Sequence, residues 1–102
     1  MFIAMNTFTI DDSRRDEFEN VWINRDRHLK GMNGFISFKL LKGDESGGKR
    51  DYISHSAWET KEDFWAWTES EAFKLAHKNR TPEGIIQGPP KFRSFEVILD
   101  ES

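Results

Sequence analysis

Hydrophobic and polar residues alternate along the first stretch of the chain, residues 2–10. One face of an extended segment would carry Phe2, Ala4, Asn6, Phe8 and Ile10. The residues between them would lie on the opposite face, because successive side chains of a strand point in opposite directions. This pattern predicts a first β-strand with one largely apolar face.

The apolar residues that follow recur with a helical period. Asp11, Asp12 or Ser13 can cap the start of a helix. Phe18, Trp22 and Leu29 then fall roughly on one helical face, which predicts a helix that runs to about residue 29. The glycine-containing segment 31–34 ends it.

Two further strands and a second helical region are predicted next. The strands are expected at residues 35–42 and 51–59, and the polar, glycine-rich segment 43–48 between them is typical of a hairpin loop. Thr60 is expected to cap a helix, and Ser70 to cap a shorter one that runs to about residue 78. A final strand is expected at residues 92–99.

The predicted order is β-α-β-β-α-β. Four strands, this split order and a short central hairpin favour an α+β, ferredoxin-like antiparallel sheet with the helices on one face. The other face would keep apolar side chains in a single copy of the chain. An uncovered apolar face predicts a partner, most simply an identical subunit in a homodimer.

Composition excludes several classes of function. The 102 residues include no cysteine, which removes disulfides, thiolate metal sites and cysteine nucleophiles. The formal net charge is −3 and no extended basic stripe occurs, so a nucleic-acid partner is not expected. The chain shows neither a signal peptide nor an apolar run of membrane-spanning length, and we expect a cytoplasmic protein without a membrane partner.

The aromatic content is high for so small a chain. Nine phenylalanines and four tryptophans occur in 102 residues, so some rings are expected to line a pocket or an interface. Trp22 and Trp58 are expected in the core. Trp67 is in helical register with Phe64 and should face inward, whereas Trp65 should face a partner subunit or solvent.

Two polar residues are candidates for chemistry. Asn6 lies in the middle of the first strand, where asparagine is depleted. Its amide is either satisfied by the sheet or exposed, or it is aimed into a pocket as a hydrogen-bond donor. His77 lies near the end of the second helical region, where it is either a partner of the helix dipole or an axial ligand of heme iron.

Three residues together resemble the pattern of the IsdG-type heme-degrading monooxygenases: Asn6, Trp67 and, ten residues after this tryptophan, His77. The segments 58–64 and 70–77 resemble that family too, and the two ends of the chain look most like its rhizobial, proteobacterial branch. These enzymes belong to the antibiotic biosynthesis monooxygenase superfamily of dimeric α/β barrels. The resemblance covers nearly the whole chain and implies a single domain over residues 1–102.

The resemblance implies a role for each residue. His77 would be the proximal ligand of heme iron, and the Asn6 amide would donate to dioxygen on the distal side. Trp67 would press on the porphyrin and distort it, while Phe64 and Phe73 would help to hold the heme. The loop 78–91 would flank the heme, with Lys78 or Arg80 meeting a propionate.

The implied reaction is heme oxygenase chemistry. Heme would be both substrate and cofactor, and dioxygen with an external electron donor would open the ring and release iron. Neither the bilin product nor the electron donor can be predicted from the residues. Two alternatives stay open: a cofactor-independent quinol or polyketide monooxygenase on the same fold, and a heme-binding dimer without enzymatic activity.

Overall fold

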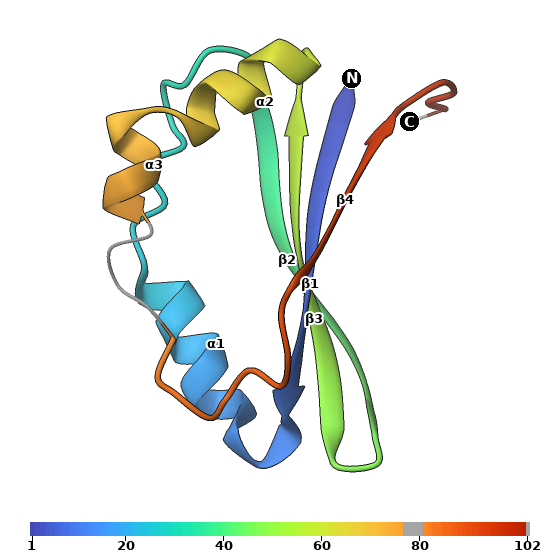
Figure 1. The fold of residues 1–102 in the computed structure, drawn as a ribbon. Helices are drawn as coiled ribbons and strands as arrows, with labels where there is room; N and C mark the ends of the chain where they lie inside the picture. The colour runs from blue at the N-terminus through green and yellow to red at the C-terminus, as the bar shows by residue number, and fades with distance from the viewer. Residues whose placement is uncertain (77–80, 102) are drawn as a thin grey trace.

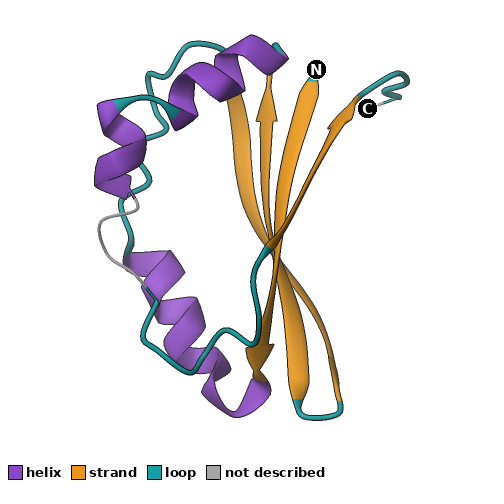
Figure 2. Ribbon diagram, in the orientation of Figure 1, coloured by secondary structure: helices purple, strands orange, loops and turns teal. Residues whose placement is uncertain are grey.

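In the part of the chain that the structure describes, four antiparallel strands form one sheet with three α-helices on a single face. The computed structural model describes residues 1–76 and 81–101. The sheet has the order β2-β3-β1-β4, and its strands are β1 (Phe2–Asp11), β2 (Phe35–Ser46), β3 (Lys49–Trp58) and β4 (Lys91–Glu96). Figures 1 and 2 show the helices on one side of it: α1 (Arg15–Asn24), α2 (Lys61–Thr68) and α3 (Glu71–Ala76). The ferredoxin-like α+β prediction is confirmed.

The turn before α1 and the helices α2 and α3 start at predicted capping residues, whereas α1 itself has no side-chain cap at Arg14. Asp11 accepts a hydrogen bond from the backbone N–H of Ser13 and begins a short 3-10 turn, η1 (Asp12–Arg14), which leads into α1. Thr60 Oγ1 accepts from the backbone N–H of Asp63 at the start of α2. Ser70 Oγ accepts a hydrogen bond from the backbone N–H of Phe73 at the start of α3. Each cap satisfies a backbone N–H that a helix start leaves without a partner.

The first helix ends at Asn24, and the prediction that it continues to about residue 29 is wrong. The backbone turns extended at Arg25, with φ −78° and ψ 130°. Arg27 Nη1 donates to the backbone carbonyl of Trp22 at 2.6 Å, which satisfies one of the carbonyls that a helix end exposes. Leu29 is still buried, because the extended segment carries it into the core.

The strand ends also differ from the sequence prediction. β2 and β3 continue to a two-residue turn at Gly47 and Gly48, whose φ angles of 60° and 79° favour glycine. The longer loop predicted at 43–48 is therefore wrong. β4 stops at Glu96, not at residue 99. Glu96 pairs with Phe2, the first residue of β1, and the backbone N–H of Val97 makes one further hydrogen bond, to the Met1 carbonyl.

The core lies between the sheet and the helices in two aromatic-rich clusters. The cluster under α2 contains Phe2, Ala4, Leu29, Trp58, Phe64 and Trp67. The cluster under α1 contains Ile10, Phe18, Trp22, Tyr52 and Ile85. Trp22 and Trp58 are core residues as predicted, and Trp65 is the exposed tryptophan. Among the described residues, no helix is long and apolar enough to cross a membrane.

Candidate functional site

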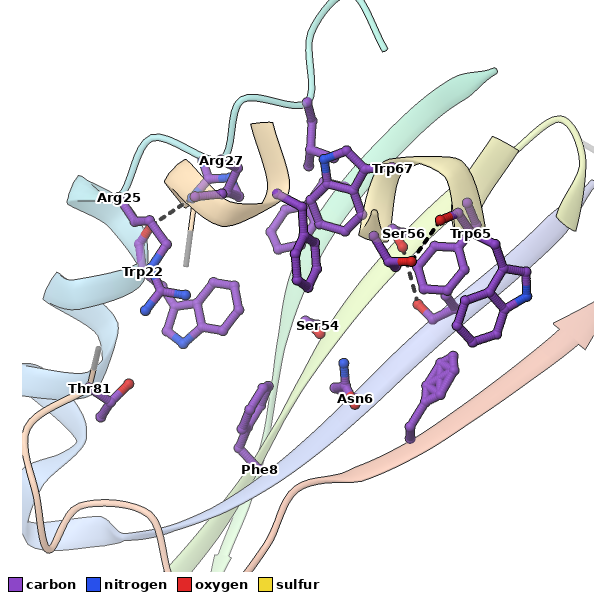
Figure 3. Close-up of a pocket in the computed structure, with 18 of the residues that line it drawn as sticks. Asn6, Phe8, Trp22, Arg25, Arg27, Ser54, Ser56, Trp65, Trp67 and Thr81 are labelled. Carbon is purple, nitrogen blue, oxygen red and sulfur yellow. Dashed lines mark hydrogen bonds between the residues drawn. The ribbon is translucent and has the colours of Figure 1, made fainter. Parts of the chain in front are cut away.

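A cavity of about 760 Å³ lies between the inner face of the sheet and the helices, and residues of both core clusters line it. This volume lies in the range of pockets that bind small molecules and cofactors. Figure 3 shows side chains from the strands and helices converging on it. The described residues that line it are Ala4, Asn6, Phe8, Trp22, Arg25, Arg27, Leu29, Phe38, Ser54, Ser56, Phe64, Trp65, Trp67, Thr68, Phe73, Ala76, Thr81, Ile86 and Phe92.

The floor of the cavity is built by the central strands and carries Asn6. Strand alternation brings Asn6 to the inner face together with Ala4 and Phe8, as the sequence predicts. The Asn6 carboxamide points into the cavity (Figure 3). In the described part of the chain it has no side-chain hydrogen bond, although Ser54 is its register partner on β3. An amide without a protein partner, in a cavity with apolar walls, is available to a ligand.

Aromatic side chains make the wall on the α2–α3 side. Trp67 is only 9% exposed, and its ring centroid lies 5.6 Å from that of Trp58 and 4.8 Å from that of Phe73. Phe64 stacks on Phe92 of β4 at 5.8 Å. The cavity that contains Asn6 is also lined by Trp67, Phe64 and Phe73.

Trp65 also borders the cavity, which sequence reasoning missed. It is 45% exposed, as its position opposite Trp67 on α2 predicts, but its ring packs edge-on against Phe64 and Phe92. Helical spacing places Trp65 away from Trp67 but gives no indication that β4 comes close to this part of α2.

Two arginines line the cavity on the α1 side. The Arg25 guanidinium lies 4.7 Å from the Trp22 ring centroid, and that of Arg27 lies 5.1 Å from the Phe38 ring centroid. Burial lowers the pKa of Arg25 from its usual value, through the cost of desolvating its charge. Among the described lining residues, these two arginines carry the charge. The cavity thus combines apolar walls with a cationic end.

His77, Lys78 and Arg80, which the sequence singled out, lie outside the described residues. The residues on both sides of them border the cavity. Ala76, the last residue of α3, is 2% exposed and lines it, and Thr81 lines it as well (Figure 3).

Comparison with known proteins gives a consistent result. Residues 1–79 match the family described as antibiotic biosynthesis monooxygenase. A heme oxygenase (staphylobilin-producing) from Staphylococcus haemolyticus is 30% identical over 89 residues, covering 87% of this chain and 85% of that protein. A heme-degrading monooxygenase from Shouchella clausii is 36% identical over 72 residues, covering 69% and 67%.

The fold also has close counterparts among solved structures. The structure of the heme-degrader MhuD from Mycobacterium tuberculosis, with two hemes bound in its active site, superimposes with a TM-score of 0.78. The match covers all of both chains at 24% sequence identity. At this identity the likeness establishes the fold, and function has to be argued from the site.

Proposed function

This chain belongs to the antibiotic biosynthesis monooxygenase family, and on that premise we propose that it is a heme-degrading monooxygenase. It would bind heme in the cavity, open the porphyrin ring with dioxygen and an external reductant, and release iron. The observation that carries the proposal is the Asn6 carboxamide, which points into the floor of a ring-walled cavity and has no side-chain hydrogen bond within residues 1–76 and 81–101. Two curated relatives named for heme degradation support it.

The described residues fit heme in shape and charge. Heme is a flat apolar ring system with two carboxylates at one edge. The wall formed by Trp67, Phe64 and Phe73 offers flat apolar surfaces, which suit the ring system. Arg25 and Arg27 offer guanidinium groups, whose planar donors suit carboxylates. Arg25 and Arg27 would therefore hold the propionates, and Asn6 and the aromatic wall would line the ring.

The proposed roles follow from this placement. His77 is proposed as the ligand of the heme iron and follows directly after Ala76, a lining residue. Asn6 is proposed to donate a hydrogen bond toward dioxygen, and Trp67 to press on the ring. Bound heme supplies the redox chemistry, and the protein orients the ring, excludes water with its aromatic walls and directs one donor.

Titration of the protein with hemin tests the proposal. We expect a saturable Soret band that shifts or is lost in His77→Ala, because imidazole ligation sets the position of the band. His28→Ala is the matched control, since His28 lies in the 25–34 connection and outside the lining residues. Ascorbate in air should then bleach the band and release iron.

Other outcomes of this titration would contradict the proposal. Absence of a saturable band would favour cofactor-independent oxygenation of an aromatic substrate in the same cavity. A Soret band that persists in ascorbate and air would favour heme binding without turnover.

We also propose that the chain forms a homodimer through the outer face of the sheet. Strand register places apolar side chains on this face in two cross-strand pairs, Leu41 with Ile53 and Ile3 with Phe95. Leu41 and Phe95 are 39% and 40% exposed, and the described helices all lie on the other face. A second copy of the chain would cover these side chains, and an exposed apolar patch of this kind favours association.

Sedimentation at micromolar concentration should therefore give twice the chain mass of 12.0 kDa. Ile53→Glu should give the monomer, because the substitution puts a charge into the proposed interface. Ile23→Glu is the matched control, since Ile23 is 70% exposed on α1, away from this face. A monomeric wild-type chain would contradict the dimer.

A further inference from the structure

Tyr52, the single tyrosine of the chain, has no role in the proposed heme chemistry, yet it is built into a specific polar contact. Its side chain is 1% exposed, and its hydroxyl donates a hydrogen bond to Glu19 Oε2. Glu19 belongs to α1, and Lys42 Nζ from β2 lies 2.8 Å from the same oxygen. The buried phenol thus has a carboxylate partner, and neither Tyr52 nor Glu19 is among the described residues that line the cavity.

A continuous set of aromatic rings connects Tyr52 to the cavity. Phe8 and Trp22 line the cavity, as Figure 3 shows, and their ring centroids lie 6.0 and 6.2 Å from that of Phe18. The Phe18 ring lies 4.8 Å from that of Tyr52. Tyr52 is also the cross-strand register partner of Phe8. The phenol therefore lies one layer of rings behind the cavity wall.

Burial and hydrogen bonding favour a neutral phenol at Tyr52 and a charged carboxylate at Glu19. Burial raises the pKa of the Tyr52 phenol above its ordinary value, and the hydrogen bond to Glu19 adds to the effect. Hydrogen bonds from Lys42 and then from Tyr52 lower the pKa of Glu19. At neutral pH a neutral phenol faces a charged carboxylate. Because an oxidised phenol is a strong acid, this carboxylate is placed to accept its proton.

We propose that the Tyr52–Glu19 pair protects the cavity by reducing oxidants that form there without productive ring opening. This inference rests on the proposed heme chemistry. One electron passes from Tyr52 through the intervening rings to a peroxide-derived oxidant in the cavity, and the hydroxyl proton passes to Glu19. The products are a neutral tyrosyl radical, a neutral carboxylic acid and the reduced oxidant. The external reductant returns one electron to Tyr52, and Glu19 returns the proton.

The protection concerns the side chains nearest to the bound heme. Trp67 and Trp22 both line the cavity, and tryptophan is readily oxidised. A radical on Tyr52 is separated from the cavity by the ring layer and is closed off from solvent. It would persist until an electron from the reductant returns to it through the same rings, whereas damage to Trp67 would be permanent.

Electron paramagnetic resonance of the wild-type protein tests this directly. The hemin-loaded protein is mixed with hydrogen peroxide, frozen within seconds and compared with protein made with ring-deuterated tyrosine. Because the chain has one tyrosine, the label is specific to Tyr52. We expect an organic radical signal whose hyperfine splitting narrows with the label. A signal that deuteration leaves unchanged, or no organic radical, would overturn the inference.

The Soret band recorded before peroxide is added separates the two proposals. If the band is absent, the proposed function fails. If it is present and no tyrosyl signal follows, only the protective role fails.

Variants test the route and the proton acceptor. Tyr52→Phe should lose the tyrosyl signal and gain oxidised Trp22 and Trp67 in peptide mass mapping. Glu19→Gln should weaken the signal, whereas Glu17→Gln should not. Glu17 is a matched carboxylate of α1 that pairs with Arg14 at the surface. Equal tryptophan oxidation in Tyr52→Phe and wild type would overturn the protective role.

Discussion

Asn6→Ala is expected to bind hemin with nearly the affinity of the wild type and to degrade it about a hundredfold more slowly, the usual cost of removing one donor that acts on developing charge. The affinity should survive because the contacts to the ring and its carboxylates are proposed to come from the aromatic wall and from Arg25 and Arg27. The rate should fall because, among the described residues that line the cavity, Asn6 carries the one carboxamide side chain. Its amide has no side-chain partner among the described residues to hold it elsewhere.

Asn6→Asp sharpens the test, since it keeps the shape of the side chain and removes the N–H donors. It should be as slow as Asn6→Ala if donation is what matters, and close to wild type if only bulk matters. Thr7→Ala is the control, because Thr7 is the next residue of β1 and faces the outer side of the sheet. Single-turnover decay of the Soret band in ascorbate and air gives the rate.

Other effects of Asn6→Ala on hemin affinity and degradation rate would change the role assigned to Asn6. If Asn6→Ala degraded hemin at the wild-type rate, Asn6 would have no part in the reaction. If the substitution abolished hemin binding, Asn6 would be a binding residue and the proposed donation to dioxygen would lose its support.

The inner face of the sheet was predictable because strand alternation is a local property. The residues of β1 that alternate with Asn6 determine which side it faces, and the structure places them as the pattern predicts. The resemblance adds Trp67, Phe64 and Phe73, and all three line the cavity with Asn6. What the sequence could not give is the register of β1 against β3 and β4, which brings Ser54 and Phe92 opposite Asn6.

The cationic end of the cavity was missed for an identifiable reason. Apolar spacing continues to Leu29, so the sequence predicts a helix through Arg25 and Arg27. The backbone instead leaves the helix after Asn24, and the two guanidinium groups pack over aromatic rings at the cavity. Leu29 is buried in both conformations, so its hydrophobicity does not distinguish them.

Trp58→Ala is expected to lower the free energy of unfolding by about 3–5 kcal/mol, the range for truncating a buried large aromatic side chain. Trp58 is fully buried, and its ring contacts Phe35, Phe64 and Trp67 at centroid distances of 5.5–5.9 Å. The cavity left by truncation would lie under Trp67, so hemin affinity should fall together with stability. Urea unfolding and hemin titration measure the two effects.

Trp58→Phe separates lost packing from lost polarity. The Trp58 Nε1–H is buried, and within residues 1–76 and 81–101 it has no hydrogen-bond partner, so phenylalanine removes an unsatisfied donor while it keeps an aromatic ring. Its cost should be well below that of alanine. Trp65→Ala, at a 45% exposed site of α2, should cost about 1 kcal/mol or less. If Trp58→Ala were as stable as Trp65→Ala, the packing of Trp58 against Trp67 would contribute little to the stability of the core.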